Sequence, residues 1–144
     1  MTRHSGSCHC GDVTFTFETA VPFAPRACQC SFCRRHNARS VSDAEGDVVL
    51  TLAPDTRRYR FGTRSSDFLI CGRCGVYVGA LADLGDGTYS VLNLNAFDDP
   101  RLELAGEPMV YDGETAEERA ARRRQRWTPA RVLQSSKKPS SNPA

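Results

Sequence analysis

The stretch CGRCG, at residues 71–75, directly follows the apolar run FLI at residues 68–70. This order predicts a strand that ends in a tight turn presenting two thiolates, where Gly75 supplies the positive φ that such a turn needs. The stretch CHCG, at residues 8–11, likewise ends in glycine and precedes a predicted strand. Because each pair offers half of a tetrahedral site, we expect both pairs to bind one structural zinc ion. The predicted ligands of this four-cysteine site are Cys8, Cys10, Cys71 and Cys74.

A shared ion at the four-cysteine site would close a loop of over sixty residues. Such a link restricts the unfolded chain strongly, because the closure of a long loop has a high entropic cost. The alternative for the C-x-x-C pair at residues 71–74 is a thioredoxin-type redox centre, which is typical of a βαβ context. The surrounding sequence predicts no βαβ unit, so a zinc site is the favoured interpretation.

Three further cysteines lie within six residues, in the stretch CQCSFC at residues 28–33. A structural zinc ion normally takes four protein ligands, whereas a catalytic zinc ion takes three and keeps one position for water or substrate. The seven cysteines of the chain divide into four and three on this basis. We therefore predict a second, catalytic zinc ion at a three-cysteine site formed by Cys28, Cys30 and Cys33. An iron–sulfur cluster is the alternative, but the spacing differs from the usual ferredoxin patterns.

Basic residues follow the three-cysteine site closely, and they are Arg34, Arg35, His36 and Arg39. Cations beside thiolates stabilise the deprotonated sulfur and can pair with the carboxylates of a ligand. The three arginines are therefore candidate substrate-binding residues, with surface exposure without a function as the equal alternative. His36 is the nearest candidate for a fourth ligand or a general base, but we expect it to be an exposed polar residue.

The composition indicates the class of protein. The chain has 144 residues, of which 40% are hydrophobic, so we expect one domain that gains stability from a metal link. No apolar run is long enough for a membrane span, and the first residues do not resemble a signal peptide. These features predict a cytoplasmic protein without a membrane partner. Clustered cysteines in that compartment, seven in number, indicate metal binding or redox chemistry and not disulfides.

The net charge of +2 conceals an uneven distribution of charged residues. The first 112 residues carry 11 basic and 14 acidic groups, whereas the remainder carries 8 basic and 3 acidic groups. An acidic core does not favour nucleic acid as a partner. The arginine run at residues 119–131 has two interpretations, a nucleic-acid patch or a solvated helix face, and we favour the second.

Hydrophobic alternation predicts a β-rich fold. At residues 12–18, Val13, Phe15 and Phe17 fall on one face of a half-buried strand. Turn signals, including the sequence GDG at residues 85–87, separate the further strands. These strands are predicted at residues 47–52, 57–61, 67–70, 76–82, 88–94, 101–104 and 108–111.

The C-terminal segment differs in composition from the β-rich part. The sequence TAEE at residues 115–118 is a capping signal for one helix, which should end before Pro129. From Gln134 onward the chain is polar and rich in Ser, Pro and Lys, which predicts disorder. These features predict a zinc-binding β domain at residues 1–112, then a basic helix and a disordered tail at residues 113–144.

The cysteine stretches together resemble a known family. They are GSCHCG at residues 6–11, CQCSFCRR at 28–35 and CGRCG at 71–75, and they resemble the glutathione-dependent formaldehyde-activating enzyme family, also called the Gfa-like or centromere protein V family. The stretch VLNLNAFD at residues 91–98 resembles the last core strand of that family, so the resemblance covers about residues 5–112. It implies a β-tent fold of stacked antiparallel sheets, with structural zinc at the four-cysteine site and catalytic zinc at the three-cysteine site.

The resemblance also implies a carbon–sulfur lyase-type reaction, similar to that of S-(hydroxymethyl)glutathione synthase. A small glutathione-like thiol would be joined to, or released from, an aldehyde such as formaldehyde. The thiol would fill the open position of the second zinc ion as a thiolate, which makes Cys28, Cys30 and Cys33 the predicted catalytic residues. Two alternatives stay open. One is a zinc-stabilised binding module without catalysis, and the other is a thiol redox switch that releases zinc on oxidation.

Overall fold

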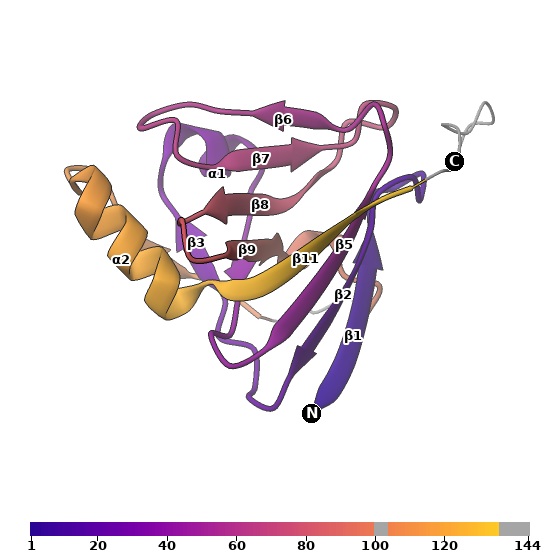
Figure 1. Ribbon diagram of the computed structural model, residues 1–144, viewed down its shortest axis with the longest axis horizontal. Helices are drawn as coiled ribbons and strands as arrows, with labels where there is room; N and C mark the ends of the chain where they lie inside the picture. The colour runs from indigo at the N-terminus through magenta and orange to yellow at the C-terminus, as the bar shows by residue number, and fades with distance from the viewer. Residues whose placement is uncertain (100–103, 136–144) are drawn as a thin grey trace.

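The computed structural model describes residues 1–99 and 104–135. Within these residues the chain is mainly β, as the sequence predicts, with one longer helix near the C-terminus (Figure 1). The strands are β1 (Thr2–Ser7), β2 (Thr14–Thr19), β3 (Arg26–Cys28), β4 (Ser40–Val41), β5 (Asp47–Leu52), β6 (Arg57–Tyr59), β7 (Asp67–Ile70), β8 (Tyr77–Asp83), β9 (Thr88–Asn93), β10 (Glu107–Met109) and β11 (Thr128–Gln134). The helices are α1 (Ser31–Arg35), the short 3-10 helix η1 (Leu94–Ala96) and α2 (Ala116–Arg126).

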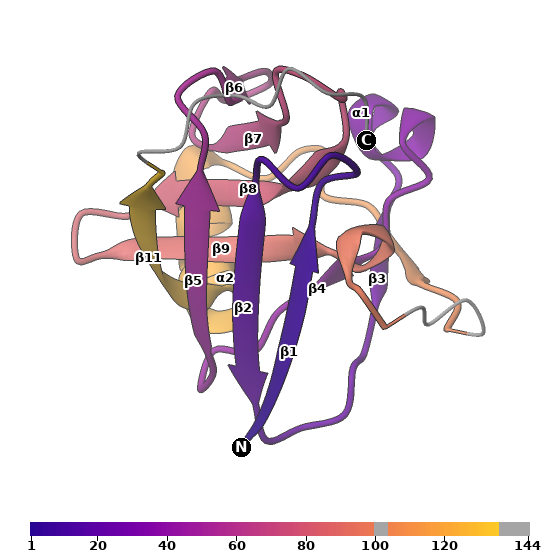
Figure 2. The ribbon, with the colours of Figure 1, turned by 90° about the vertical axis from the view of Figure 1, so that its right-hand side faces the viewer.

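The strands form two layers that cross each other. One layer contains β1, β2, β5 and part of β11, and the other contains β6, β7, β8 and β9, from which β4, β3 and β10 continue. Figure 2 shows β1, β2 and β5 in front of β8 and β9, with α2 behind them. Neighbouring strands are mostly antiparallel, as predicted, but β10 pairs with β3 and β11 pairs with β5 in parallel.

Side chains between the two layers form the main hydrophobic core. The alternation predicted for the first of the strands is confirmed, because Val13, Phe15 and Phe17 are all buried. The ring of Phe15 meets the ring of Phe97 edge-on, with 4.9 Å between the centroids, which is a favoured aromatic geometry. The fully buried leucines of this core come from both layers, and they are Leu50, Leu52, Leu69 and Leu92.

Strand β11 connects the two layers. Its first residues, Thr128 and Pro129, pair antiparallel with β9, and its remaining residues, 130–134, pair in parallel with β5. The sequence predicts no strand here, because TPARVLQ contains a proline and shows no regular apolar alternation. The segment that follows α2 is nevertheless part of the sheet.

The predicted disordered tail begins at Gln134, but Gln134 belongs to β11. The next residue, Ser135, donates its backbone N–H to the carbonyl oxygen of Leu52 over 2.9 Å. The rest of the predicted tail lies outside the described residues, and so does most of the strand predicted at residues 101–104. The division of the chain at residue 112 stays a prediction.

The longer strands agree with the predicted ranges. Strands β5 and β7 have the predicted bounds, and β6, β8, β9 and β10 differ from them by one or two residues. The sequence does not predict β1, β3, β4 or α1. These elements are only two to six residues long and lack apolar alternation, so their local sequence carries little signal.

The predicted start of α2 is confirmed as a capping box. The Thr115 hydroxyl accepts a hydrogen bond from the Glu118 backbone N–H over 3.1 Å, and the Glu118 carboxylate accepts one from the Thr115 N–H over 3.0 Å. The helix ends at Arg126, before Pro129, as the sequence predicts. This cap fixes where α2 begins against the sheet.

Thr115→Ala should lower the free energy of unfolding by about 1 kcal/mol, because it leaves a helix N–H without its partner. Urea unfolding followed by circular dichroism measures this change. Thr115→Ser keeps the hydroxyl group and should retain the original stability. Equal destabilisation by both substitutions would contradict the capping role.

Candidate functional site

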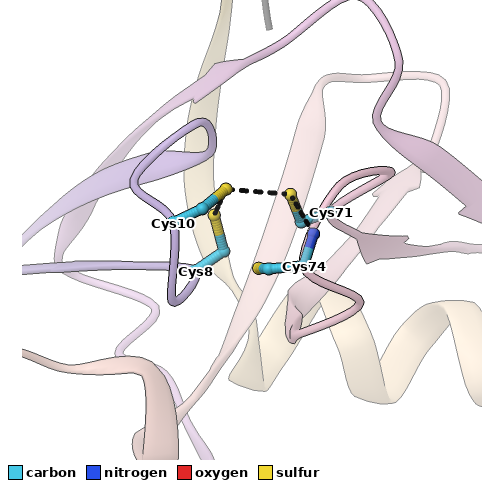
Figure 3. A group of neighbouring side chains, drawn as sticks. All are labelled: Cys8, Cys10, Cys71 and Cys74. Atoms are coloured by element: carbon cyan, nitrogen blue, oxygen red, sulfur yellow. Dashed lines mark hydrogen bonds between the residues drawn. The ribbon is translucent and has the colours of Figure 1, made fainter. Parts of the chain in front are cut away.

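Four cysteines converge from the β1–β2 loop and the β7–β8 loop (Figure 3). Their four Sγ atoms lie within 4.8 Å of one another. The Sγ atoms of Cys8 and Cys10 are 3.7 Å apart, and those of Cys10 and Cys71 are 3.6 Å apart. The structure therefore brings together the two pairs that the sequence assigns to one four-cysteine site.

The geometry of the four-cysteine site fits a tetrahedral zinc ion. Zn–S bonds of about 2.3 Å place the ligand sulfurs about 3.8 Å apart. Disulfide sulfurs would be about 2.05 Å apart, and all seven cysteines are free. Backbone amides also point at the sulfurs: Val13 N–H donates to Cys8 Sγ over 3.3 Å, and Cys74 N–H donates to Cys71 Sγ over 3.4 Å. The four-cysteine site can therefore hold a metal ion, and its sulfur donors are consistent with zinc.

The two loops of the four-cysteine site share one turn geometry. In each loop the first cysteine donates its backbone N–H to the carbonyl oxygen five residues later, over 2.9 Å for Cys8 and 3.1 Å for Cys71. Gly11 and Gly75 then adopt φ values of +85° and +81°. The positive φ predicted for Gly75 is confirmed, and side chains other than glycine would strain both turns.

Burial and hydrogen bonds act in opposite directions on the pKa values of the four-cysteine site. Burial raises the pKa of Cys8 to about 12, since Cys8 is only 1% exposed. Burial acts in the same direction on Cys74, but hydrogen bonds from the backbone of Cys10 and Val76 prevail and lower its pKa to about 7. A bound metal ion must displace the remaining protons, so metal affinity should fall as the pH is lowered.

The three-cysteine site lies where β3 leads into α1. The Sγ atoms of Cys28, Cys30 and Cys33 lie within 4.8 Å of one another. Cys30 is the N-cap of α1, and its Sγ accepts a hydrogen bond from the Cys33 backbone N–H over 3.4 Å. Hydrogen bonds from the Cys28 and Cys33 thiols lower the pKa of Cys30 well below its usual value. These three sulfurs can also hold a metal ion, as predicted, and they come from a single turn of chain.

A cavity of about 600 Å³ adjoins the three-cysteine site. The three cysteines form part of its wall, and α2 with its flanking residues forms another part. Aromatic side chains complete much of the lining, and they are Phe61, Phe68, Tyr77, Tyr111 and Trp127. The cavity is large enough for a small organic molecule to reach the sulfurs.

Tyr77 faces this cavity because of a β-bulge. Ile70 of β7 pairs with Tyr77, whereas Leu69 pairs with Gly79, so Val78 is an extra residue in β8. Val78 packs in the main core, and Tyr77 packs beside Cys33 and lines the cavity. Sequence patterns did not single out Tyr77, since the position of a bulge depends on pairing with a distant strand.

Burial raises the pKa of Tyr77 well above its ordinary value, and negative charge on the three-cysteine site acts in the same direction. Tyr77 is 3% exposed, so its hydroxyl stays protonated at neutral pH. The site therefore contains a phenolic O–H donor beside the thiols.

Only one of the three arginines predicted to bind substrate lies in the described cavity wall. Arg34 lines the cavity, and its Nε donates to the Gln29 carbonyl oxygen over 3.1 Å. Arg35 and Arg39 are not among the described residues of the cavity wall. The Arg35 guanidinium donates to the Ser31 carbonyl oxygen, and that of Arg39 donates to the Asn95 side chain.

His36 is exposed, as expected, and follows α1 as its C-cap, with 5.5 Å between its ring centroid and that of Tyr77. Its ring packs on the ring of Phe32, with 4.5 Å between the centroids. In the described part of the chain, the group of potential ligands around Cys28, Cys30 and Cys33 does not include His36. The geometry supplies three ligands from this cluster and no fourth.

The interpretation of the arginine run as a solvated helix face is correct for Arg124 and Arg126, which are exposed, but not for the whole run. Arg119, Arg122 and Arg123 all line the cavity. The first two pair with Glu114, over 3.3 Å and 2.8 Å, whereas Arg123 is buried. The amphipathic pattern is obscured in sequence because arginines occupy both the inner and the outer face of α2.

The chain also matches known proteins. A family model described as glutathione-dependent formaldehyde-activating enzyme matches residues 3–112. The chain belongs to this family. The fold is similar to that in a crystal structure of a Rhodobacter sphaeroides protein, with a TM-score of 0.58 and 30% sequence identity. The matched region covers 73% of this chain and 99% of that chain. The family match ends before α2 and β11.

Among residues 1–99 and 104–135, neither the length nor the hydropathy of a helix reaches what a membrane crossing requires.

Cys8→Ser should abolish cooperative thermal unfolding, because a structural zinc ion contributes about 10–16 kcal/mol of apparent binding energy to small domains. Circular dichroism during heating measures this, with inductively coupled plasma mass spectrometry for the metal content. Cys28→Ser is the matched control, since it alters only the three-cysteine site, which lies outside the main core. It should leave the cooperative thermal unfolding transition in place. A wild-type melting temperature for Cys8→Ser would contradict the structural role.

Proposed function

We propose that this protein joins or cleaves the carbon–sulfur bond between a small thiol and an aldehyde such as formaldehyde. The observation that carries this proposal is the set of three cysteines on the wall of a cavity of about 600 Å³. Three sulfur ligands from one turn leave a tetrahedral ion one open position. Membership of the glutathione-dependent formaldehyde-activating enzyme family supports the choice of thiol and aldehyde as substrates.

The residues of the three-cysteine site would hold the zinc ion and position the substrate. When bound there, zinc would favour the deprotonated form of a substrate thiol at neutral pH. The Cys33 backbone N–H, directed at Cys30 Sγ, stabilises negative charge on the ligand sulfur.

Tyr77 is the proposed hydrogen-bond donor in the cavity wall. As the substrate sulfur bonds to the aldehyde carbon, the carbonyl π electrons move to oxygen, and that oxygen requires a proton. Tyr77 lines the same cavity, and its hydroxyl stays protonated because the residue is buried. It can donate a hydrogen bond to the developing oxyanion, which then takes up a proton from solvent in place of the one that the thiol released to solvent. The reverse sequence releases the aldehyde.

The structure does not favour a nucleic-acid-binding module. Such a module would present its arginines on one accessible surface, whereas α2 directs Arg119, Arg122 and Arg123 toward the cavity. A thiol switch would use the same three cysteines, so the reaction assay separates it from the enzyme. A switch would release zinc with mild peroxide and would not accelerate the exchange of thiol and aldehyde.

The zinc-loaded protein should accelerate the exchange of formaldehyde with its thiol adduct. Exchange NMR with glutathione and several smaller thiols measures the rate. Cys30→Ser should abolish the acceleration, while Thr115→Ser, which alters a helix cap far from the sulfurs in sequence, should keep it. A folded, zinc-loaded protein that accelerates exchange for none of the thiols would contradict the proposal.

Tyr77→Phe should reduce the exchange rate by about a hundredfold or more, because it removes the hydroxyl donor and retains the ring. Thiol binding should stay within a factor of about three, since the hydroxyl acts on the aldehyde oxygen. Tyr89→Phe, on the neighbouring strand β9, is the matched control and should leave the rate unchanged. An unchanged rate in Tyr77→Phe would exclude the proposed donor.

A further inference from the structure

Part of the cavity wall comes from a segment that the family match does not include. Residues 3–112 match the family, whereas α2 spans Ala116–Arg126 and is followed by Trp127. Arg123 and Trp127 both line the cavity. This part of the cavity wall therefore lies outside the residues that match the family.

Arg123 is a buried cation on which the Glu114 carboxylate acts only at longer range. It is 6% exposed, and its Nη1 donates to the Ser65 hydroxyl over 2.8 Å. Its guanidinium lies over the Trp127 ring, 4.7 Å from the centroid. Its Nε has no hydrogen-bond partner, and no carboxylate within residues 1–99 and 104–135 forms an ion pair with it. Burial of an unpaired charge is unfavourable, so this arrangement calls for an anion.

The charges around the cavity favour an anionic ligand. Among residues 1–99 and 104–135, two acidic residues line it, Asp112 and Glu114, and Glu114 already pairs with two arginines. Five arginines line it, and they are Arg26, Arg34, Arg119, Arg122 and Arg123. Arg26 is half-buried and donates to the Ser42 hydroxyl over 2.6 Å. A carboxylate entering the cavity therefore meets cations on several sides.

The surroundings of Arg123 also restrict what can carry that anion. Phe68, Ala80, Val91 and Trp127 line the cavity and belong to one packed apolar cluster. Peptide groups placed against such a wall would lose their hydrogen bonds to water. An alkyl or aromatic group would instead gain from the contact.

We propose that Arg123 and this apolar wall form a subsite for a carboxylate carried on an apolar group. The three-cysteine site lies on the wall of the same cavity, so the substrate would be a thiol whose apolar body ends in a carboxylate. The thiol end rests on the proposed function, whereas the carboxylate end rests only on Arg123 and its neighbours. Arg123 is thus a specificity-determining residue supplied by α2.

Binding measurements on the zinc-loaded full chain test this subsite without requiring turnover. Isothermal titration calorimetry would compare 3-phenylpropionate with its neutral amide, 3-phenylpropanamide, and with S-methylglutathione. We expect the carboxylate to bind at least tenfold more tightly than the amide and than S-methylglutathione. Arg123→Gln should remove the preference for the carboxylate over the amide. Arg124→Gln is the matched control, because Arg124 pairs with Asp86 outside the cavity, and it should keep that preference.

Equal binding of the acid and the amide to the unaltered protein would overturn the proposal, whether or not Arg123→Gln folds. Arg26→Gln, at another arginine of the cavity wall, should weaken carboxylate binding by less than Arg123→Gln. Tighter binding of S-methylglutathione than of 3-phenylpropionate would show that the subsite does not prefer an apolar group beside the carboxylate. Failure of the exchange reaction would refute the proposed function and leave these binding results intact, so the two proposals can fail separately.

Discussion

The convergence of four cysteine sulfurs between the β1–β2 loop and the β7–β8 loop is the constraint on which the rest of the structure depends. Cys8 and Cys71 are both almost fully buried, and the sulfurs are spaced as ligands of one tetrahedral ion. Without a shared cation these thiols would be weak hydrogen-bonding groups in the interior. With one, the two loops are held together, and the two crossed layers are fixed relative to each other.

Strand β8 lies between the main core and the cavity, and its residues contact both. Val78 and Leu81 pack in the main core between the layers, while Tyr77 and Ala80 line the cavity on the other face. The β-bulge opposite Ile70 makes this change of direction possible. A rigid sheet therefore carries the tyrosine, and the loop after β3 carries the three sulfurs. The positions of the reacting groups follow from how β8 is anchored.

Much of the fold and the metal chemistry could be predicted because the signals are local. The spacing of Cys71 and Cys74 before a glycine specifies a turn, and the alternation of Phe15 and Phe17 specifies a strand face. The capping box at Thr115 is equally local. The change of sheet along β11, the direction of Tyr77 and the burial of Arg123 depend instead on partners far away in the sequence. No periodicity in the sequence records those partners, so the cavity could not be predicted.

The division of the seven cysteines into a closed site and an open site is the central claim, and metal stoichiometry measures it most directly. Native mass spectrometry of protein prepared under reducing conditions with zinc available should show two zinc ions per chain. Cys30→Ser should bind one and stay folded, since the four-cysteine site is intact. One zinc ion in the unaltered protein, or two in Cys30→Ser, would contradict the account.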